Sequence, residues 1–365
     1  MSHAQRLDQL KLAIDKAGYS ALIITNPMSI YYLTGYENSD PGERLFALLV
    51  QAQGPSQIFL NRLFPQPDRH FNQDIQVHWH EDGQDVILSM AQSLKEAKKV
   101  GIDKDWRAHF VLSLIQSLPT ATFDNGSPLV DGMRQIKSSQ EQALMIEASH
   151  LNDLAMEKLI SLIGQGLSEK EIVAVLIDTY QELGCKGLAF EPIIAYGPNG
   201  ADPHHMTDQT RPQKGQSVVL DIGSYYQGYA SDMTRTVFYG QPDPESIKVY
   251  ELVKAANLAA IAQVKPGVPY AAIDKAARDV IEAGGYGPYF THRTGHNIGI
   301  ECHEPGDVGQ YNQELVQVGH VFSIEPGIYL PGKLGVRIED LVIVTEDGCK
   351  VLNQVSKDLM VIDPQ

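Results

Sequence analysis

The chain has 365 residues, 43% of them hydrophobic and 20% charged, which is typical of a soluble globular protein of about two domains. Its 29 basic and 45 acidic residues give a net charge of −16, which argues against a general nucleic-acid-binding protein. The chain has no apolar run of about 18 residues, so no membrane span is expected, and its charged N-terminus is unlike a signal peptide. The three scattered cysteines (Cys185, Cys302 and Cys349) are too few for a disulfide framework and fit a cytoplasmic protein.

The first third of the chain alternates short strands with helices. Leu7, Leu10 and Ile14 recur at helical spacing, and Gly18 is placed to end that helix. Strands are expected at 20–25, 45–50, 57–60 and 100–103, and helices at 28–33, 86–97 and 110–118. This alternation predicts an α/β domain with a mixed or parallel sheet. The turn residues at 125–128 predict its end, so we expect domains at 1–130 and 131–365.

This first domain shows no chemical motif. His78 and His80 flank Trp79, but two alternating histidines beside a tryptophan are more typical of an edge strand than of a ligand pair. We expect the domain to shape access to a site elsewhere or to form a subunit contact.

The remaining two thirds begin with two helices that carry the same start signal. Ser138 with Glu141, and Ser168 with Glu171, each form a capping-box pattern. These patterns predict helices over 138–163 and 168–184. Further strands are expected at 190–196, 217–222 and 229–238, and further helices at 243–264 and 271–283.

This part of the chain resembles itself at an offset near 101 residues. The matching pairs are Gly166 with Gly267, Ile172 with Ile273, and Cys185 with Tyr286. GQSVVLD (215–221) and GHVFSIE (319–325) each place a carboxylate six residues after a glycine, at the end of an apolar strand. A second acid follows after 11 residues in one case and after 14 in the other. We therefore predict a duplicated α+β unit whose two hairpins each bring two carboxylates to one place.

The four acids of these hairpins stand in apolar, β-rich surroundings: Asp221, Asp232, Glu325 and Glu339. An Asp at a strand end often caps the following turn, and that interpretation would suffice for Asp221 alone. Four such acids brought together would repel one another and resist ionisation unless they share a cation. With His296 beside them, they suit a pair of hard divalent ions.

Five of the 12 histidines fall in two small groups: His204 with His205, and His292 with His296 and His303. A zinc site of the HExxH type needs Glu directly after the first His, where this chain has Arg293. A mononuclear three-histidine zinc site is an alternative, but it leaves the four acids unexplained. We favour a functional cluster over isolated structural histidines.

Five motifs in this order, VVLDIG, GYASDMTRT, THRTGHNIGIECHEP, FSIEPGIY and GVRIEDL, resemble those of the pita-bread-fold Xaa-Pro peptidases, namely prolidase (Xaa-Pro dipeptidase) and aminopeptidase P. The resemblance covers the whole chain. It implies a creatinase/prolidase-type N-terminal domain, then an α+β pita-bread catalytic domain with an internal pseudo-two-fold repeat. It also implies hydrolysis of the Xaa-Pro bond by two divalent metal ions, with Mn²⁺ expected and Co²⁺ or Zn²⁺ as alternatives. The expected partners are a short proline-containing peptide as substrate and a second copy of the chain in a homodimer.

By this resemblance the metal ligands are Asp221, Asp232, His296, Glu325 and Glu339. Asp232 and Glu339 would bridge the two ions. Glu325 would also be the general base that takes a proton from the attacking water.

The other roles implied by the resemblance fall to three histidines and an arginine. His204 and His303 would donate hydrogen bonds to the substrate carbonyl or the oxyanion. His292 would line the proline pocket. Arg337 would orient the site and help to bind the substrate, although a salt bridge to a nearby carboxylate is an alternative role for it.

The chain departs from the family pattern at three positions. His205 and Asn297 stand where the family commonly has glycine, so both side chains would fill room near the substrate, and His205 is expected to contact it. Asp307 stands where many prolidases place an arginine that can meet the free carboxylate of a dipeptide. An Asp cannot pair with a carboxylate, so aminopeptidase P activity on longer peptides is the alternative to the dipeptidase that we favour.

Three other classes of protein are alternatives for the same residues. Creatinase shares the fold but does not need the full set of five ligands, so the presence of all five argues against creatinase. A non-catalytic binding module on this fold should have lost ligands, and none is missing here. Methionine aminopeptidase lacks an N-terminal domain like the one expected here at 1–130, which argues against that class.

Overall fold

The computed structural model describes residues 1–38, 41–66 and 75–365 and divides the chain into two compact units, Met1–Arg134 and Gln135–Gln365. In the described part of the chain, no helix is both long and apolar enough to cross a membrane.

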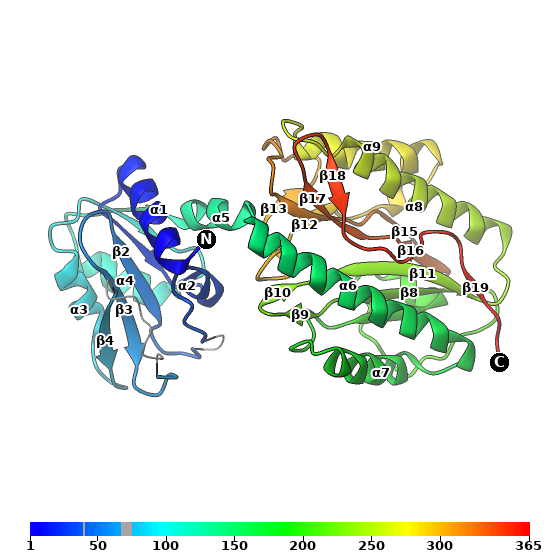
Figure 1. The fold of residues 1–365 in the computed structure, drawn as a ribbon, viewed down its shortest axis with the longest axis horizontal. Helices are drawn as coiled ribbons and strands as arrows, with labels where there is room; N and C mark the ends of the chain where they lie inside the picture. The colour runs from blue at the N-terminus through cyan, green and yellow to red at the C-terminus, as the bar shows by residue number, and fades with distance from the viewer. Residues whose placement is uncertain (39–40, 67–74) are drawn as a thin grey trace. The chain divides into compact units, whose positions relative to one another are not determined.

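The first unit is built on a six-stranded sheet in the order β4-β3-β2-β1-β5-β6 (Figure 1). The strands are β1 Ala21–Ile24, β2 Ala47–Gln51, β3 Ser56–Asn61, β4 Ile75–His80, β5 Lys99–Ile102 and β6 Thr122–Asn125. Strand β1 runs antiparallel to β2 and parallel to β5, so the sheet is mixed. Strand β4 lies at the edge, as predicted for the His78 segment, and there the His78 ring stacks on Phe59 with centroids 4.8 Å apart.

Five helices accompany this sheet in the described residues: α1 His3–Lys16, α2 Pro27–Thr34, α3 Val86–Ser93, α4 Ala108–Ser117 and α5 Ser127–Gln135. Local sequence sets their starts. Ser2 and Gln5 form a capping box at α1, and Asn26 caps α2 ahead of Pro27. The prediction missed both β6 and α5, and it extended α3 to residue 97, four residues beyond its end.

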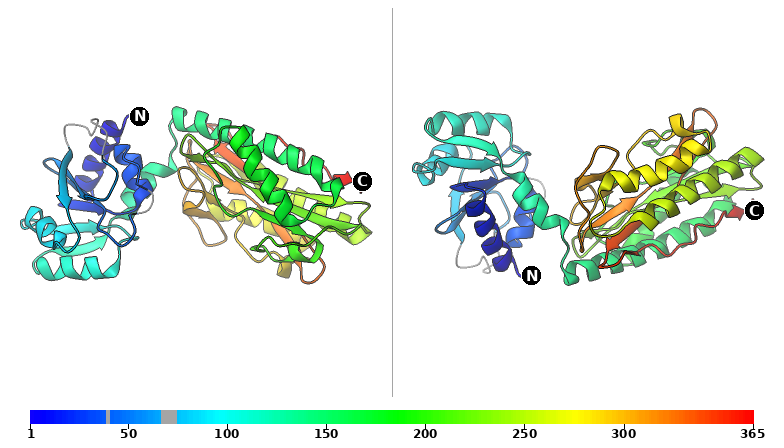
Figure 2. Two further views of the ribbon diagram at one scale, coloured as in Figure 1. Left: turned by 90° about the horizontal axis from the view of Figure 1, so that it is seen from below. Right: turned by 90° about the horizontal axis from the view of Figure 1, so that it is seen from above.

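The second unit contains two pairs of long helices: α6 Ser139–Leu162 with α7 Glu169–Glu182, and α8 Pro244–Gln263 with α9 Tyr270–Ala283. The two predicted capping boxes, at Ser138 and Ser168, are both formed. Within this unit, Figures 1 and 2 show α6 and α7 on one side of the strands and α8 and α9 on the other. Short 3₁₀ helices lie at η1 Ile163–Gln165, η2 Gly197–Ala201 and η3 Gly287–Tyr289.

Two antiparallel three-stranded cores repeat the same order. In the first half they are β7 Ile193–Tyr196, β8 Gln216–Ile222 and β11 Met233–Tyr239, and in the second half β12 Gly295–Asn297, β14 Val321–Ile324 and β17 Asp340–Val344. The remaining strands are β9 Tyr225–Tyr226, β10 Tyr229–Ala230, β13 Glu304–Val308, β15 Gly327–Leu330, β16 Leu334–Arg337, β18 Cys349–Val351 and β19 Val361–Ile362. Each half is thus a helix pair followed by three antiparallel strands, which is the duplicated α+β unit that the sequence predicts.

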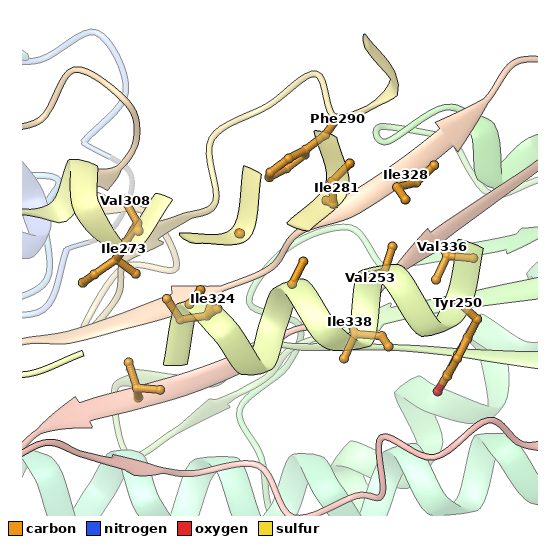
Figure 3. Packing of buried hydrophobic residues seen from close by; sticks show 14 of the residues in the cluster. Tyr250, Val253, Ile273, Ile281, Phe290, Val308, Ile324, Ile328, Val336 and Ile338 are labelled. Atoms are coloured by element: carbon orange, nitrogen blue, oxygen red, sulfur yellow. The ribbon is translucent and has the colours of Figure 1, made fainter. Parts of the chain in front are cut away.

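Each helix pair buries its apolar face on the strands of its own half. Met156 and Leu176 of α6 and α7 pack with Leu220 of β8 in one cluster. In the other, Val253 of α8 packs with residues that include Ile324 and Val336, part of which Figure 3 shows. At about 25 cal/mol per Å² of apolar surface, the burial of these clusters is the main favourable contribution to the folding of the unit.

Candidate metal centre

Four acids and His296 converge because the two hairpins place them at equivalent points. Asp221 lies near the end of β8, and Asp232 directly precedes β11. In the second half, Glu325 directly follows β14, and Glu339 directly precedes β17. The two hairpins are joined where the Glu339 N–H donates to the Thr234 carbonyl at 3.0 Å. The fold therefore brings strand ends together that are about a hundred residues apart in sequence.

The distances place the four acids and His296 in one cluster. One potential ligand atom from each of Asp232, His296 and Glu339 lies within 4.8 Å of the other two. His296 Nε2 is 3.6 Å from both Asp232 Oδ2 and Glu325 Oε1. All four acids and His296 line one cavity of about 1180 Å³. The five residues expected to hold metal therefore do lie together.

Three carboxylate oxygens of the cluster are buried without a hydrogen-bond partner among the described residues: Asp221 Oδ1, Asp232 Oδ1 and Glu339 Oε1. The Asp232 and Glu339 residues are only 4% and 2% exposed. A buried, unpaired carboxylate is costly unless a cation coordinates it. Oxygen donors with one imidazole are ligands suited to Mn²⁺ and similar divalent ions. The residues present therefore fit a divalent metal centre.

The protonation behaviour of these groups agrees with that fit. Burial, and then the charges of Asp221 and Glu325, raise the pKa of Asp232 well above its ordinary value. Burial, and then Asp232, raise the pKa of Glu339 in the same way. Burial raises the pKa of Glu325 to about 7 and lowers the pKa of His296 to about 3. Asp232, Glu325 and Glu339 therefore resist ionisation without a cation, while His296 is neutral and free to act as a ligand.

Hydroxyl and thiol donors hold the individual acids in place. Thr234 Oγ1 donates to Glu339 Oε2 at 2.7 Å, and Cys302 Sγ donates to Asp232 Oδ2 at 3.3 Å. Ser323 Oγ accepts from the His296 N–H at 3.0 Å and donates to Glu325 Oε1 at 3.3 Å. Such outer contacts orient ligands before metal arrives.

The three histidines expected to act on substrate also line the cavity. The rings of His303 and His296 lie with centroids 4.1 Å apart. The His204 N–H donates to Asp202 Oδ1 at 2.9 Å, which fixes the turn that carries it. His292 Nε2 lies 2.8 Å from the Tyr329 hydroxyl, and burial, then Arg337, lower the pKa of His292 to about 4. All three therefore surround the acidic cluster, with His292 neutral.

Arg337 contacts the cluster from β16. Its Nη2 donates to Asp221 Oδ2 at 2.5 Å, and its Nη1 donates to the Tyr329 hydroxyl at 3.0 Å. The salt bridge that the sequence left as an alternative is thus present, and through Tyr329 the same guanidinium also fixes His292. Tyr329 was not among the predicted site residues, although it follows Glu325 at a spacing of four within the FSIEPGIY motif.

His205 lines the cavity, but its ring is engaged. Its Nε2 lies 2.8 Å from Oε2 of Glu169, a fully buried acid at the start of α7. Glu169 also accepts from the backbone N–H groups of Tyr196 and Asp208, at 3.0 and 2.9 Å. Glu169 was missed by sequence reasoning, which used only its neighbours in the capping box. It fastens the segment that carries His204 and His205.

Asn297, the second departure from the family pattern, has a structural contact. Its Nδ2 donates to the Pro305 carbonyl at 2.9 Å across a register shift between β12 and β13. Gly306 completes this bulge with a φ of +120°, and a Cβ there would lie 2.1 Å from Asn297 Nδ2. The third departure, Asp307, pairs with Arg293, which lines the cavity, so the charge of Asp307 is compensated.

Comparison with known proteins agrees with a metal centre at this site. Residues 143–346 match the model of metallopeptidase family M24, and residues 6–136 match that of the creatinase/prolidase N-terminal domain. An uncharacterised peptidase of Staphylococcus aureus is 34% identical over 338 residues, which are 92% of this chain and 94% of the relative.

Two solved structures resemble the whole chain. A Xaa-Pro dipeptidase from Bacillus anthracis is 30% identical with a TM-score of 0.90, and the match covers 99% of this chain and 100% of that one. An X-Pro aminopeptidase from Thermotoga maritima is 27% identical with a TM-score of 0.79, and the match covers 96% and 100%.

The fold and the acidic cluster together define a metallopeptidase. The chain belongs to metallopeptidase family M24, with a creatinase/prolidase-type domain ahead of a pita-bread catalytic domain. It is a peptidase that uses divalent metal ions.

Proposed function

We propose that this protein is a Xaa-Pro dipeptidase with two divalent metal ions. Mn²⁺ is the expected metal, and Co²⁺ or Zn²⁺ is the alternative. The observation that carries the proposal is the convergence of four carboxylates, three of them with unpaired buried oxygens, beside the neutral His296. Its likeness to the Bacillus anthracis Xaa-Pro dipeptidase supports the choice of bond and of substrate length.

The proposed ligands divide between the two ions. Asp232 and Glu339, each with a ligand atom within 4.8 Å of the other, would bridge both ions. Asp221 would complete one coordination sphere, and His296 with Glu325 the other. Two such ions supply a nucleophilic water at neutral pH and polarise the scissile carbonyl.

The proton transfers fall to Glu325. Its Oε1 lies 3.6 Å from His296 Nε2, so the carboxylate faces the place where the ions and the attacking water would be held. Glu325 would take a proton from the attacking water and deliver it to the proline nitrogen, which leaves as a secondary amine. Ser323 Oγ keeps Oε1 oriented during these transfers.

The surrounding histidines would act on the substrate. His204 and His303 would donate hydrogen bonds to the carbonyl as it becomes an oxyanion. His292, held by Tyr329, would form a wall of the proline pocket. His205 would contribute shape rather than a hydrogen bond through Nε2, because Glu169 already engages that nitrogen.

The direct test is to supply Mn²⁺ and compare Ala-Pro with Ala-Pro-Ala. We expect close to two ions per chain by metal analysis, efficient cleavage of the dipeptide, and loss of activity with a chelator. Activity that persists in metal-free protein would contradict the mechanism. Cleavage of the tripeptide alone would replace the dipeptidase with an aminopeptidase. The homodimer and the cytoplasmic location stay predictions from the sequence.

A further inference from the structure

An ion pair stands beside the acidic cluster at a place that the proposed mechanism does not use. Arg293 Nη1 donates to Asp307 Oδ1. Arg293 lies two residues before β12, and Asp307 lies on β13 directly opposite His296. The bulge closed by Gly306 sets this register. The position of the pair is therefore fixed by the same hairpin that carries the proposed ligand His296.

Arg293 faces the cavity and retains free hydrogen-bonding capacity. It lines the cavity with a side chain that is 38% exposed. A guanidinium has five N–H donors on three nitrogens. Among the residues that the structure describes, the side chain has Asp307 on Nη1 and no acceptor on Nε or Nη2. The guanidinium can thus hold Asp307 and a second carboxylate together, which a lysine ammonium does less specifically.

Arg293 lies close to the proposed metal centre. It lines the same cavity as the four acids and His296. Its partner Asp307 stands opposite His296 in the pairing of β12 with β13. A substrate whose scissile carbonyl lies at the acidic cluster therefore has Arg293 within the same cavity.

The other two cations of the cavity are less suitable for a ligand. Arg337 is fully engaged by Asp221, the Tyr329 hydroxyl and Thr234 Oγ1. Lys170 stands on the exposed surface of α7. Among the residues that the structure describes, Arg293 is thus the cavity cation that lies next to the centre and keeps free donors.

We propose that Arg293, oriented by Asp307, binds the free carboxylate of the C-terminal proline and so selects dipeptides. This inference rests on the proposed function. The proline carboxylate of a dipeptide lies one residue, about 3.5 Å, beyond the scissile carbonyl. A tripeptide has a neutral amide there, which cannot form the bidentate ion pair that a carboxylate forms with a guanidinium. Asp307 then orients the arginine and does not exclude a dipeptide.

The test combines substitutions in the enzyme with a change of one group in the substrate. Wild-type, Arg293→Gln, Arg293→Lys and Lys170→Gln proteins are each assayed with Ala-Pro and with Ala-Pro amide, which differ only in the carboxylate. Arg293→Gln should lower kcat/KM for Ala-Pro on the order of 10- to 100-fold, as expected for a lost hydrogen bond to a charged group, and leave the amide nearly unchanged. Arg293→Lys should recover part of the loss. Lys170→Gln, the matched control, should match wild type on both substrates.

The outcomes distinguish a failure of the Arg293 assignment from a failure of the proposed dipeptidase function. If wild type with Mn²⁺ cleaves neither Ala-Pro nor Ala-Pro-Ala, the proposed function fails. If wild type cleaves Ala-Pro but Arg293→Gln slows both substrates equally, or neither, the assignment of Arg293 is wrong. The same selective loss in Lys170→Gln would overturn it as well. Metal content and unfolding temperature of Arg293→Gln, expected to equal those of wild type, exclude misfolding as the cause of a selective loss.

Discussion

Arg337 Nη2 donates a 2.5 Å hydrogen bond to Asp221 Oδ2, so that a guanidinium from β16 neutralises a carboxylate on β8. Both side chains are nearly buried, 4% and 11% exposed. A buried pair is most sensitive to the loss of one member, because the remaining charge is then uncompensated. This pair therefore ties the stability of the second unit to the geometry of its acidic cluster.

Arg337→Gln should destabilise the metal-free protein by about 3–5 kcal/mol, the cost of leaving one buried charge without its partner. Denaturant unfolding after chelation measures this. Arg211→Gln is the matched control, because Arg211 pairs with Glu171 at the surface, where such a pair contributes about 0–1 kcal/mol. If the two substitutions cost the same, Asp221 does not depend on Arg337 for charge compensation.

Asp232→Asn should remove both activity and the second metal ion. An amide cannot supply the two anionic oxygens that a bridging ligand needs, so the loss should exceed the roughly 10- to 100-fold effect of changing an outer-sphere residue. Metal analysis and kcat with Ala-Pro measure the two effects. Asp279→Asn, at an exposed acid of α9 paired with Lys275, should change neither. An Asp232→Asn protein that retains two ions and activity would show that Asp232 is no ligand.

The sequence predicted the helix pairs and the acidic hairpins because their signals are local. A capping box starts α6 and α7, and a glycine six residues before an acid recurs in both halves. The prediction could not find the contacts of Arg293 with Asp307, because a bulge between β12 and β13 sets that register. Tyr329 was missed for a similar reason. Its role depends on the contacts of its hydroxyl with His292 and Arg337, which only the folded structure shows.

Metal binding should stabilise the protein more as pH rises. Burial raises the folded-state pKa of Glu325 from 4.5 to about 7. Its contribution to the stability of metal-free protein is therefore fully present below about 4.5 and is lost as pH rises through about 7. Asp232 and Glu339 shift in the same direction. Bound cations need these acids ionised, so metal binding releases protons and strengthens over the same range.

The measurement is the difference in unfolding temperature between Mn²⁺-loaded and chelator-treated protein, at intervals from about pH 5 to 8, which spans the titration of Glu325. Taking the difference cancels groups outside the site that titrate alike in both forms. The gap should widen with pH. A gap that stays constant or narrows would mean that the acids are ionised without metal, contrary to their burial.

Glu169→Gln should loosen the segment that carries His204 without touching the acidic cluster. Glu169 accepts hydrogen bonds from the backbone of Tyr196 and Asp208, and His205 Nε2 also contacts it. An amide in its place must turn an N–H₂ group towards donors, at a cost of about 1–3 kcal/mol for unsatisfied buried groups. We expect lower thermal stability and a lower kcat for Ala-Pro, with normal metal content.

Glu171→Gln provides the matched control for this change. Glu171 lies two residues further along α7 and is half-exposed, and Gln can serve at the same capping-box position. Its stability and kcat should therefore stay close to those of wild type. A selective fall in kcat with Glu169→Gln supports a positioning role, because a purely structural loss would lower stability and leave kcat of the folded enzyme unchanged. Equal behaviour of the two variants would mean that Glu169 does not position His204.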